Sequence, residues 1–147
     1  MTEQNNKELH IISENGTTIF SKETKYVIPL YQRAFAWKEK QLVQLIEDVS
    51  DISADSGNDY YLGTLIVAKK DNAFEVIDGQ QRLTALYLLL SVLEQTIEKD
   101  VLTFECRDNS NYTLNNIQTI LTNDRGSLDT ERIEPGIWEG LEILKNT

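Results

Sequence analysis

One short segment of the sequence combines residue types that bind phosphate. Asp78, Gly79 and Arg82 lie within five positions, after the apolar residues 74–77 and before a leucine-rich stretch. A strand that ends in glycine at the start of a helix exposes unpaired N–H groups, and these bind anions together with the helix dipole. Gly79 would let a ligand approach the backbone, and Arg82 would add a bidentate guanidinium. The segment is therefore a candidate phosphate site.

The same segment also fits a structural role. Asp78 followed three positions later by Gln81 is a capping box, in which Asp78 accepts from a helix N–H and Gln81 reaches back. On spacing alone, this structural interpretation is the more common one.

A second cluster places Arg33 among three aromatic residues, namely Tyr31, Phe35 and Trp37. A cation beside an aromatic wall suits stacking of a base. The more common arrangement is that such aromatics belong to the core, with the arginine packed over them. Gly63, inside an apolar strand, could mark close approach of a ligand or, equally, tight packing against a helix.

Other reactive side chains offer less. Cys106 is the only cysteine, so an intramolecular disulfide and a thiolate zinc site are excluded, and we expect it to be a small core residue. His10 is the only histidine and lies in a polar segment, which makes a catalytic role improbable. Asp48 falls on the polar side of a predicted helix, where a carboxylate is solvated by default. The sequence has no phosphate-binding loop ending in Lys-Ser/Thr, no dinucleotide fingerprint and no His-Glu-x-x-His helix.

Composition limits the classes of function. The 147 residues include 14 basic and 24 acidic side chains, for a net charge of -10. This balance argues against sequence-independent binding to a phosphate backbone, so an anion site must be local. Residues 20–90 carry 10 acidic and 8 basic side chains, so the region with the motifs is nearly neutral. No apolar run reaches the ~20 residues of a membrane span, and no signal peptide is recognisable, which predicts a cytoplasmic protein that does not contact a membrane.

The hydrophobic pattern predicts an α/β fold, with a small mixed sheet flanked by helices. The expected strands are 25–30, which Pro29 ends, 60–68, which is apolar on both faces and therefore central, 74–77, paired antiparallel with 60–68, and 101–107. The expected helices are 38–53, a core helix that begins at Asp78-Gly79 and includes Leu83 to Leu93, a weak one at 113–121, and one at 137–144. Residues 108–111 and 123–135 are predicted as loops.

Four ordered motifs, at residues 28–37, 44–49, 60–67 and 76–86, strongly resemble one family. It is the N-terminal domain of GmrSD-type modification-dependent restriction endonucleases and related phage-defence proteins. The resemblance is close over about residues 17–98. The family is similar in fold to the ParB and sulfiredoxin superfamily, in which Gly-x-x-Arg at a helix N-terminus holds nucleotide phosphates, so the resemblance favours the phosphate interpretation of Gly79 and Arg82.

The resemblance implies binding and Mg²⁺-dependent hydrolysis of a nucleoside triphosphate, with GTP, ATP and CTP all open. Gly79 and Arg82 would bind phosphate, and Arg33 would be a second phosphate or transition-state contact, aided by Gln32 and Tyr31.

The remaining implied roles concern catalysis. Gln80 or Gln81 would orient water, and Asp78 would hold a metal-bound water or act as base. The catalytic set is thus Asp78, Gln80, Gln81 and Arg82, with Phe35, Trp37 and Gly63 as the wall for the base.

The resemblance also implies an organisation. We expect a flexible segment at 1–16, a ParB/sulfiredoxin-like nucleotide-binding core at 17–107 and a helical C-terminal extension at 108–147. Full-length members usually carry an HNH-type nuclease domain, whose histidines are absent here, so a nuclease domain or subunit would be a partner and DNA would be contacted only through the full-length protein. A homodimer is possible. The alternative function is a non-catalytic module that senses DNA or a protein through the same cleft.

Overall fold

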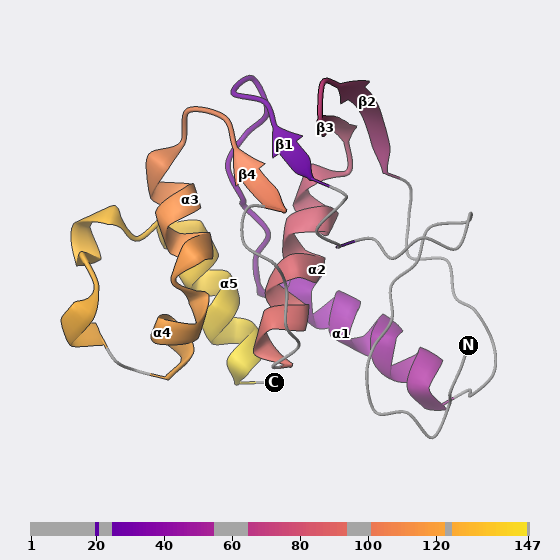
Figure 1. Cartoon of the computed structure of the whole chain (residues 1–147). Coiled ribbons are helices and arrows are strands. Elements are labelled where there is room, and N and C mark those ends of the chain that lie inside the picture. Colours follow the sequence, from indigo (N-terminus) through magenta and orange to yellow (C-terminus); the bar gives the residue numbers. More distant parts are fainter. Residues whose placement is uncertain (1–19, 21–24, 55–64, 94–100, 123–124, 147) are drawn as a thin grey trace.

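The computed structural model describes residues 20, 25–54, 65–93, 101–122 and 125–146. The described strands are β1 (Tyr26–Ile28), β2 (Ile66–Lys70), β3 (Ala73–Asp78) and β4 (Leu102–Phe104). The described α-helices are α1 (Glu39–Ala54), α2 (Gln80–Val92), α3 (Asp108–Asn115), α4 (Ile117–Leu121) and α5 (Pro135–Lys145). Figure 1 shows the strands gathered at one end of the molecule, with α2 running away from the sheet between α1 and α5. The predicted α/β class is confirmed.

The four described strands form one mixed sheet in the order β2-β3-β1-β4. β1 lies parallel to both β3 and β4, and Val27 pairs with Glu75 on one side and with Thr103 on the other. β2 and β3 form the predicted antiparallel hairpin, with Asp71 in a left-handed conformation (φ 57°) at its turn. Because β1, β3 and β4 are parallel, their carboxyl ends meet at one edge of the sheet.

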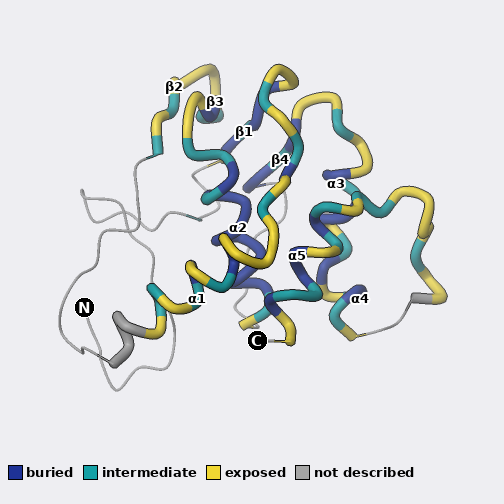
Figure 2. Tube along the Cα trace, turned by 180° about the vertical axis from the view of Figure 1, so that it is seen from behind, coloured by how far each residue is buried: buried dark blue, intermediate teal, exposed yellow. Residues whose placement is uncertain are grey.

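Helix α2 is the centre of the hydrophobic core. Leucine and alanine favour helix, and every residue from Leu83 to Ser91 is buried. Figure 2 shows much of this helix in the colour of buried residues. The predicted core helix is therefore confirmed, and its first turn is anchored where β3 ends.

Helix α5 packs against both α1 and α2. Pro135 occupies its first turn, and Ile137, Leu141 and Leu144 belong to the same core as α2. Gly140 allows close contact, since a Cβ there would lie 2.9 Å from Phe35 Cε2. The C-terminal helical region therefore contributes to the core that supports the sheet.

The prediction of a central strand at 60–68 is wrong for its described part. β2 begins at Ile66 and is an edge strand, with four of its five residues exposed. The central place belongs to β1, because its parallel pairing with β3 and β4 puts it inside the sheet. An apolar run alone does not report strand order. The calls on residues 55–64 lie outside the described residues, as does the segment 1–16.

Two further expectations are corrected in the region after β4. Residues 108–111, predicted as a loop, form the first turn of α3, where Asp108 suits the positive end of the helix dipole. Cys106, predicted as a core residue, is exposed and has φ 59° in the turn between β4 and α3. Residues 125–127 and 130–132, within a predicted loop, form short 3-10 turns.

Candidate functional site

The start of α2 lies where β3 ends, as predicted. Gly79 is the N-cap residue, with φ 97°, a left-handed conformation that favours glycine. The Asp78 carboxylate accepts a hydrogen bond from the Gly79 N–H at 3.0 Å, and no side chain of the described residues caps the helix. The capping-box interpretation is therefore wrong, because neither Asp78 nor Gln81 bonds a free N–H of the first turn.

Gln81 uses its side chain to hold another segment. Its Oε1 accepts from the Ala36 N–H at 2.8 Å, and its Nε2 donates to the Ala34 carbonyl at 3.1 Å. The side chain is buried, so these two bonds satisfy both ends of an amide that has little access to water. Gln81 thus holds residues 34–36 against the first turn of α2 by two hydrogen bonds, which places Trp37 beside that turn.

Residues 31–33 lie at the same edge of the sheet. Gln32 Nε2 donates to the Ile77 carbonyl at 2.9 Å, which ties this segment to the end of β3. Tyr31 is 70% exposed and Arg33 is exposed as well, while Gln32 is partly buried. The predicted phosphate ligands therefore stand on a segment that is fixed to β3 through Gln32.

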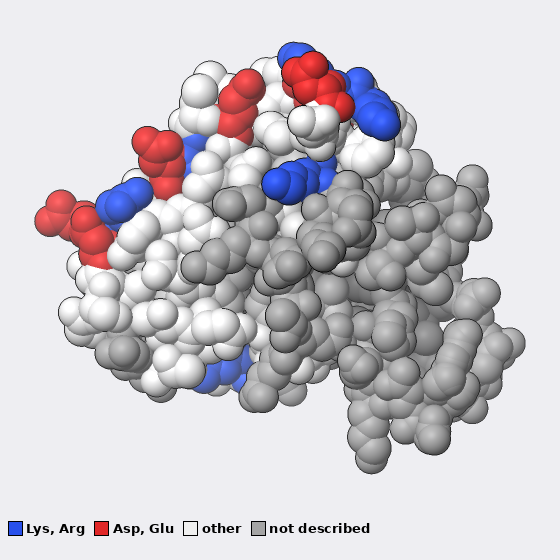
Figure 3. Space-filling view, viewed as in Figure 1, with Lys and Arg blue, Asp and Glu red and all other residues white. Residues whose placement is uncertain are grey.

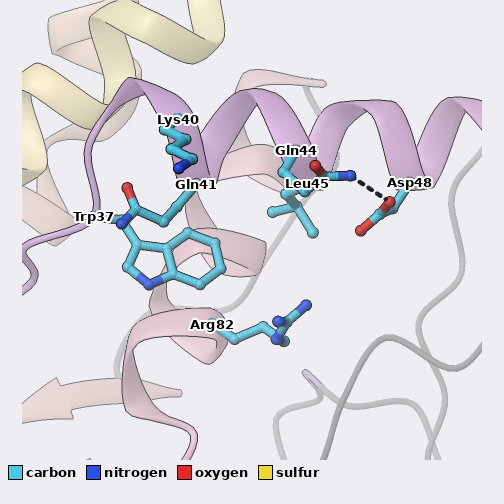
Figure 4. Close-up of a pocket in the computed structure, with 7 residues that line it drawn as sticks. All are labelled: Trp37, Lys40, Gln41, Gln44, Leu45, Asp48 and Arg82. Carbon is cyan, nitrogen blue, oxygen red and sulfur yellow. Dashed lines mark hydrogen bonds between the residues drawn. The ribbon is translucent and has the colours of Figure 1, made fainter.

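Arg82 and Trp37 face each other. The Arg82 Cζ lies 5.6 Å from the centroid of the Trp37 ring, a distance typical of a cation–π contact. Both residues line a pocket of about 280 Å³ between α1 and the start of α2. Figure 4 shows Arg82 reaching from α2 into the space beside α1, with Trp37 at one end of the pocket.

The α1 side of this pocket carries charged residues that the sequence analysis did not assign to a site. Lys40 and Asp48 line it, and Asp48 accepts a hydrogen bond from Gln44 Nε2 at 3.0 Å. Asp48 was expected to be simply solvated, yet it is partly buried here. Counting from Trp37, these residues recur at helical spacing, and that periodicity was the signal for a shared face.

The other predicted site residues differ in where they lie. Phe35 is 3% exposed and packs against α5, so it is part of the core and does not form a wall for a ligand. Gln80 is partly exposed, and Asp78 is exposed. Gly63 lies outside the described residues.

Charge on the described surface is mixed. Figure 3 shows basic and acidic side chains interspersed on the face seen there, without a broad basic area among the described residues. In the described part of the chain the single salt bridge joins Lys38 to Glu139, at 3.3 Å, so Arg82, Arg33 and Lys40 have no acidic partner there. The described residues also contain no group of three or more His, Cys, Asp or Glu side chains arranged to hold a metal ion. None of the described helices combines the length and the apolar character that crossing a bilayer requires.

The fold and the pocket define a small α/β domain with a cationic, aromatic-lined pocket at the first turn of its central helix. The GmrSD restriction endonuclease N-terminal domain family matches residues 17–144, and the chain belongs to this family. Membership indicates a protein of restriction and phage defence. Comparison with curated proteins and with solved structures finds no match.

Proposed function

We propose that this domain binds a nucleoside triphosphate together with Mg²⁺, at the pocket between α1 and the start of α2, and hydrolyses it. The observation that carries the proposal is the Arg82–Trp37 pair in a pocket that also holds Lys40 and Asp48. Arg82 and Lys40 have no acidic partner among the described residues, so they favour phosphate oxygens, and an indole beside them suits a base or sugar. The supporting context is the family to which the chain belongs.

The first turn of α2 offers a second set of groups that would bind the phosphates. In the described part of the chain no side chain caps this turn, so its N–H groups and the helix dipole favour an anion next to Arg82. The pocket, at about 280 Å³, is slightly smaller than the usual range for ligand pockets, so it would hold one part of a nucleotide while the rest extends along the sheet edge. Arg33 on residues 31–33 would then be the second phosphate contact.

The carboxylates suit a metal that the ligand itself helps to bind. Mg²⁺ is usually held by one or two carboxylates, waters and substrate phosphates, so a cage of three acidic side chains is not required. Among the described residues, Asp48 lines the pocket and Asp78 lies at the end of β3, so these two carboxylates are the ones that we assign to the metal. When bound, Mg²⁺ would offset phosphate charge. In the hydrolysis step Gln80 is the glutamine left to orient water, because the amide of Gln81 is already bonded at both ends.

Thermal melting with Mg²⁺ and ATP, GTP or CTP tests the binding half. A ligand at 100 times its Kd adds about 2.7 kcal/mol to the stability of the folded state, which for a chain of this size raises Tm by about 5–10 °C. Arg82→Ala is expected to abolish the rise, and Arg82→Lys to retain part of it. Release of inorganic phosphate measures hydrolysis separately.

Arg132→Ala is the matched control. Like Arg82, Arg132 makes a cation–π contact, with its Cζ 4.2 Å from the centroid of the Tyr112 ring, but it lies outside the pocket. Its removal should leave the nucleotide response intact. If no nucleotide shifts the Tm of the wild-type chain while DNA binding is measurable, the proposal fails and the non-catalytic sensing module takes its place.

A further inference from the structure

We propose that Arg107 is a positioning residue for the segment that carries Tyr31 and Arg33, an inference that rests on the proposed nucleotide site. Arg107 follows β4 and lies 75 positions along the chain from Gln32. Its Nη2 donates to the Gln32 carbonyl at 3.0 Å. The guanidinium thus bonds the backbone between the two exposed residues that the site would use.

Glu105, in the same turn, makes two hydrogen bonds near the start of this segment. The first is accepted by its Oε1 from the Leu30 N–H at 3.0 Å, and the second is donated by its N–H to the Ile28 carbonyl at 2.8 Å. The second of these bonds continues the β1–β4 pairing past the ends of the strands. Cys106, with φ 59°, lies between the two residues whose side chains bond the segment.

The bonds continue across the sheet edge to β3. Gln32 accepts from Arg107 through its backbone carbonyl and donates through its side chain to the Ile77 carbonyl at 2.9 Å. Ile77 directly precedes Asp78, the last residue of β3, and α2 begins two residues after Asp78. The ends of β4, β1 and β3 are therefore joined through Gln32, and Arg107 forms one end of this connection.

The guanidinium of Arg107 is partly buried where it bonds the segment. Its Nε is buried and has no hydrogen-bond partner among the described residues, so the Nη2 bond to the Gln32 carbonyl is the hydrogen bond that this guanidinium makes there. Within the described residues no carboxylate forms a salt bridge with it. A charged donor to a carbonyl is stronger than a neutral one, so the Gln32 backbone is held more firmly than by a typical amide bond.

Hydrogen–deuterium exchange of the ligand-free chain tests the positioning directly. Arg107→Ala should speed exchange of the Leu30 and Gln32 amides about tenfold, the effect of losing a charged hydrogen bond, while α5 stays unchanged. Arg107→Lys keeps the positive charge and an N–H donor for the Gln32 carbonyl, so it should restore most of the protection. Arg132→Ala, remote from the segment, should have no effect.

The nucleotide measurement separates a positioning role from a purely structural one. Arg107→Ala should weaken the apparent affinity for the Mg²⁺ nucleotide about tenfold, with rescue by Arg107→Lys. Unchanged exchange at residues 30–32 overturns the inference, and so does faster exchange with unchanged affinity. If the wild-type chain binds no nucleotide, the proposed function fails by itself, and exchange alone then decides whether Arg107 holds the segment.

Discussion

Replacement of Gln81 tests the role that the structure gives to this side chain. Gln81→Ala removes two hydrogen bonds and leaves the Ala36 N–H and the Ala34 carbonyl without their partners. Each bond contributes about 0.5–1.5 kcal/mol net, and groups left unpaired raise the loss, so we expect a loss of about 2–3 kcal/mol in the free energy of unfolding. For a chain of this size, that lowers Tm by about 5–10 °C.

The loss of these bonds should also alter the fluorescence of Trp37, which directly follows residues 34–36. The chain has two tryptophans, so a Trp138→Phe background leaves Trp37 as the single fluorophore. Loss of the two Gln81 hydrogen bonds should expose the Trp37 indole to water and shift its emission to longer wavelength. Gln81→Glu keeps the acceptor for Ala36 but turns the donor facing Ala34 into an acceptor, and it should lose nearly as much stability as the alanine variant.

Gln80→Ala is the matched control for the neighbouring residue. Gln80 is partly exposed, and its side chain makes no hydrogen bond to a described residue, so its Tm should stay within about 1–2 °C of wild type, as for most surface changes. The reasoning is refuted if Gln81→Ala leaves both Tm and Trp37 emission unchanged. A Gln81 that only oriented water would lower phosphate release without altering either measurement.

Three further predictions concern the core, the pH dependence and the sheet edge. Gly140→Ala should destabilise the chain by about 1–3 kcal/mol in denaturant unfolding, because the new Cβ would meet the Phe35 ring, whereas Gly126→Ala, with open space around it, should be neutral; equal midpoints would contradict this packing. Burial raises the pKa of the Tyr26 hydroxyl above 10.0. The folded state therefore keeps its proton longer than the unfolded state, so this contribution to stability is complete below pH 10 and declines above it. Tyr26→Phe should show a shallower loss of Tm above pH 10, and an identical profile would count against the assignment. β4 is an edge strand of the described sheet, and the Asn111 side chain bonds both the N–H and the carbonyl of Phe104, at 2.8 and 2.9 Å. Asn111→Ala should therefore lower Tm and increase self-association measured by light scattering, because these edge groups become free to pair with another chain. A monodisperse variant of unchanged Tm would contradict this.

Local pattern was sufficient for the elements around the site. Pro29 ends β1, the apolar face from Leu42 to Val49 predicts α1, and the run after Gly79 predicts α2, because each of these signals acts within a few residues along the chain. The junction of β3, Gly79 and α2 was predictable for the same reason. Strand order was not, since the apolar residues of β2 read as central although β2 is an edge strand.

The roles of individual side chains were less predictable, because their partners lie far along the chain. Spacing allowed Gln81 to be a capping residue or a catalytic one, yet its amide bonds residues 45 and 47 positions away. Phe35 and Trp37 are two positions apart in an aromatic cluster, but the first is buried against α5 and the second lines the pocket. Alternation of this kind depends on which helices pack on either side of the segment.

The sequence by itself determined the α/β class, the helix that starts at Gly79 and the family, because these depend on local periodicity and on motifs contained in short segments. Only the tertiary structure decided that Asp48 and Lys40 share a pocket with Arg82, and that Arg107 bonds the backbone at Gln32. The physical reason is that both arrangements join segments far apart in the sequence: the pocket forms where α1 lies beside the start of α2, and parallel pairing of β1 with β3 and β4 brings Arg107 to the backbone at Gln32.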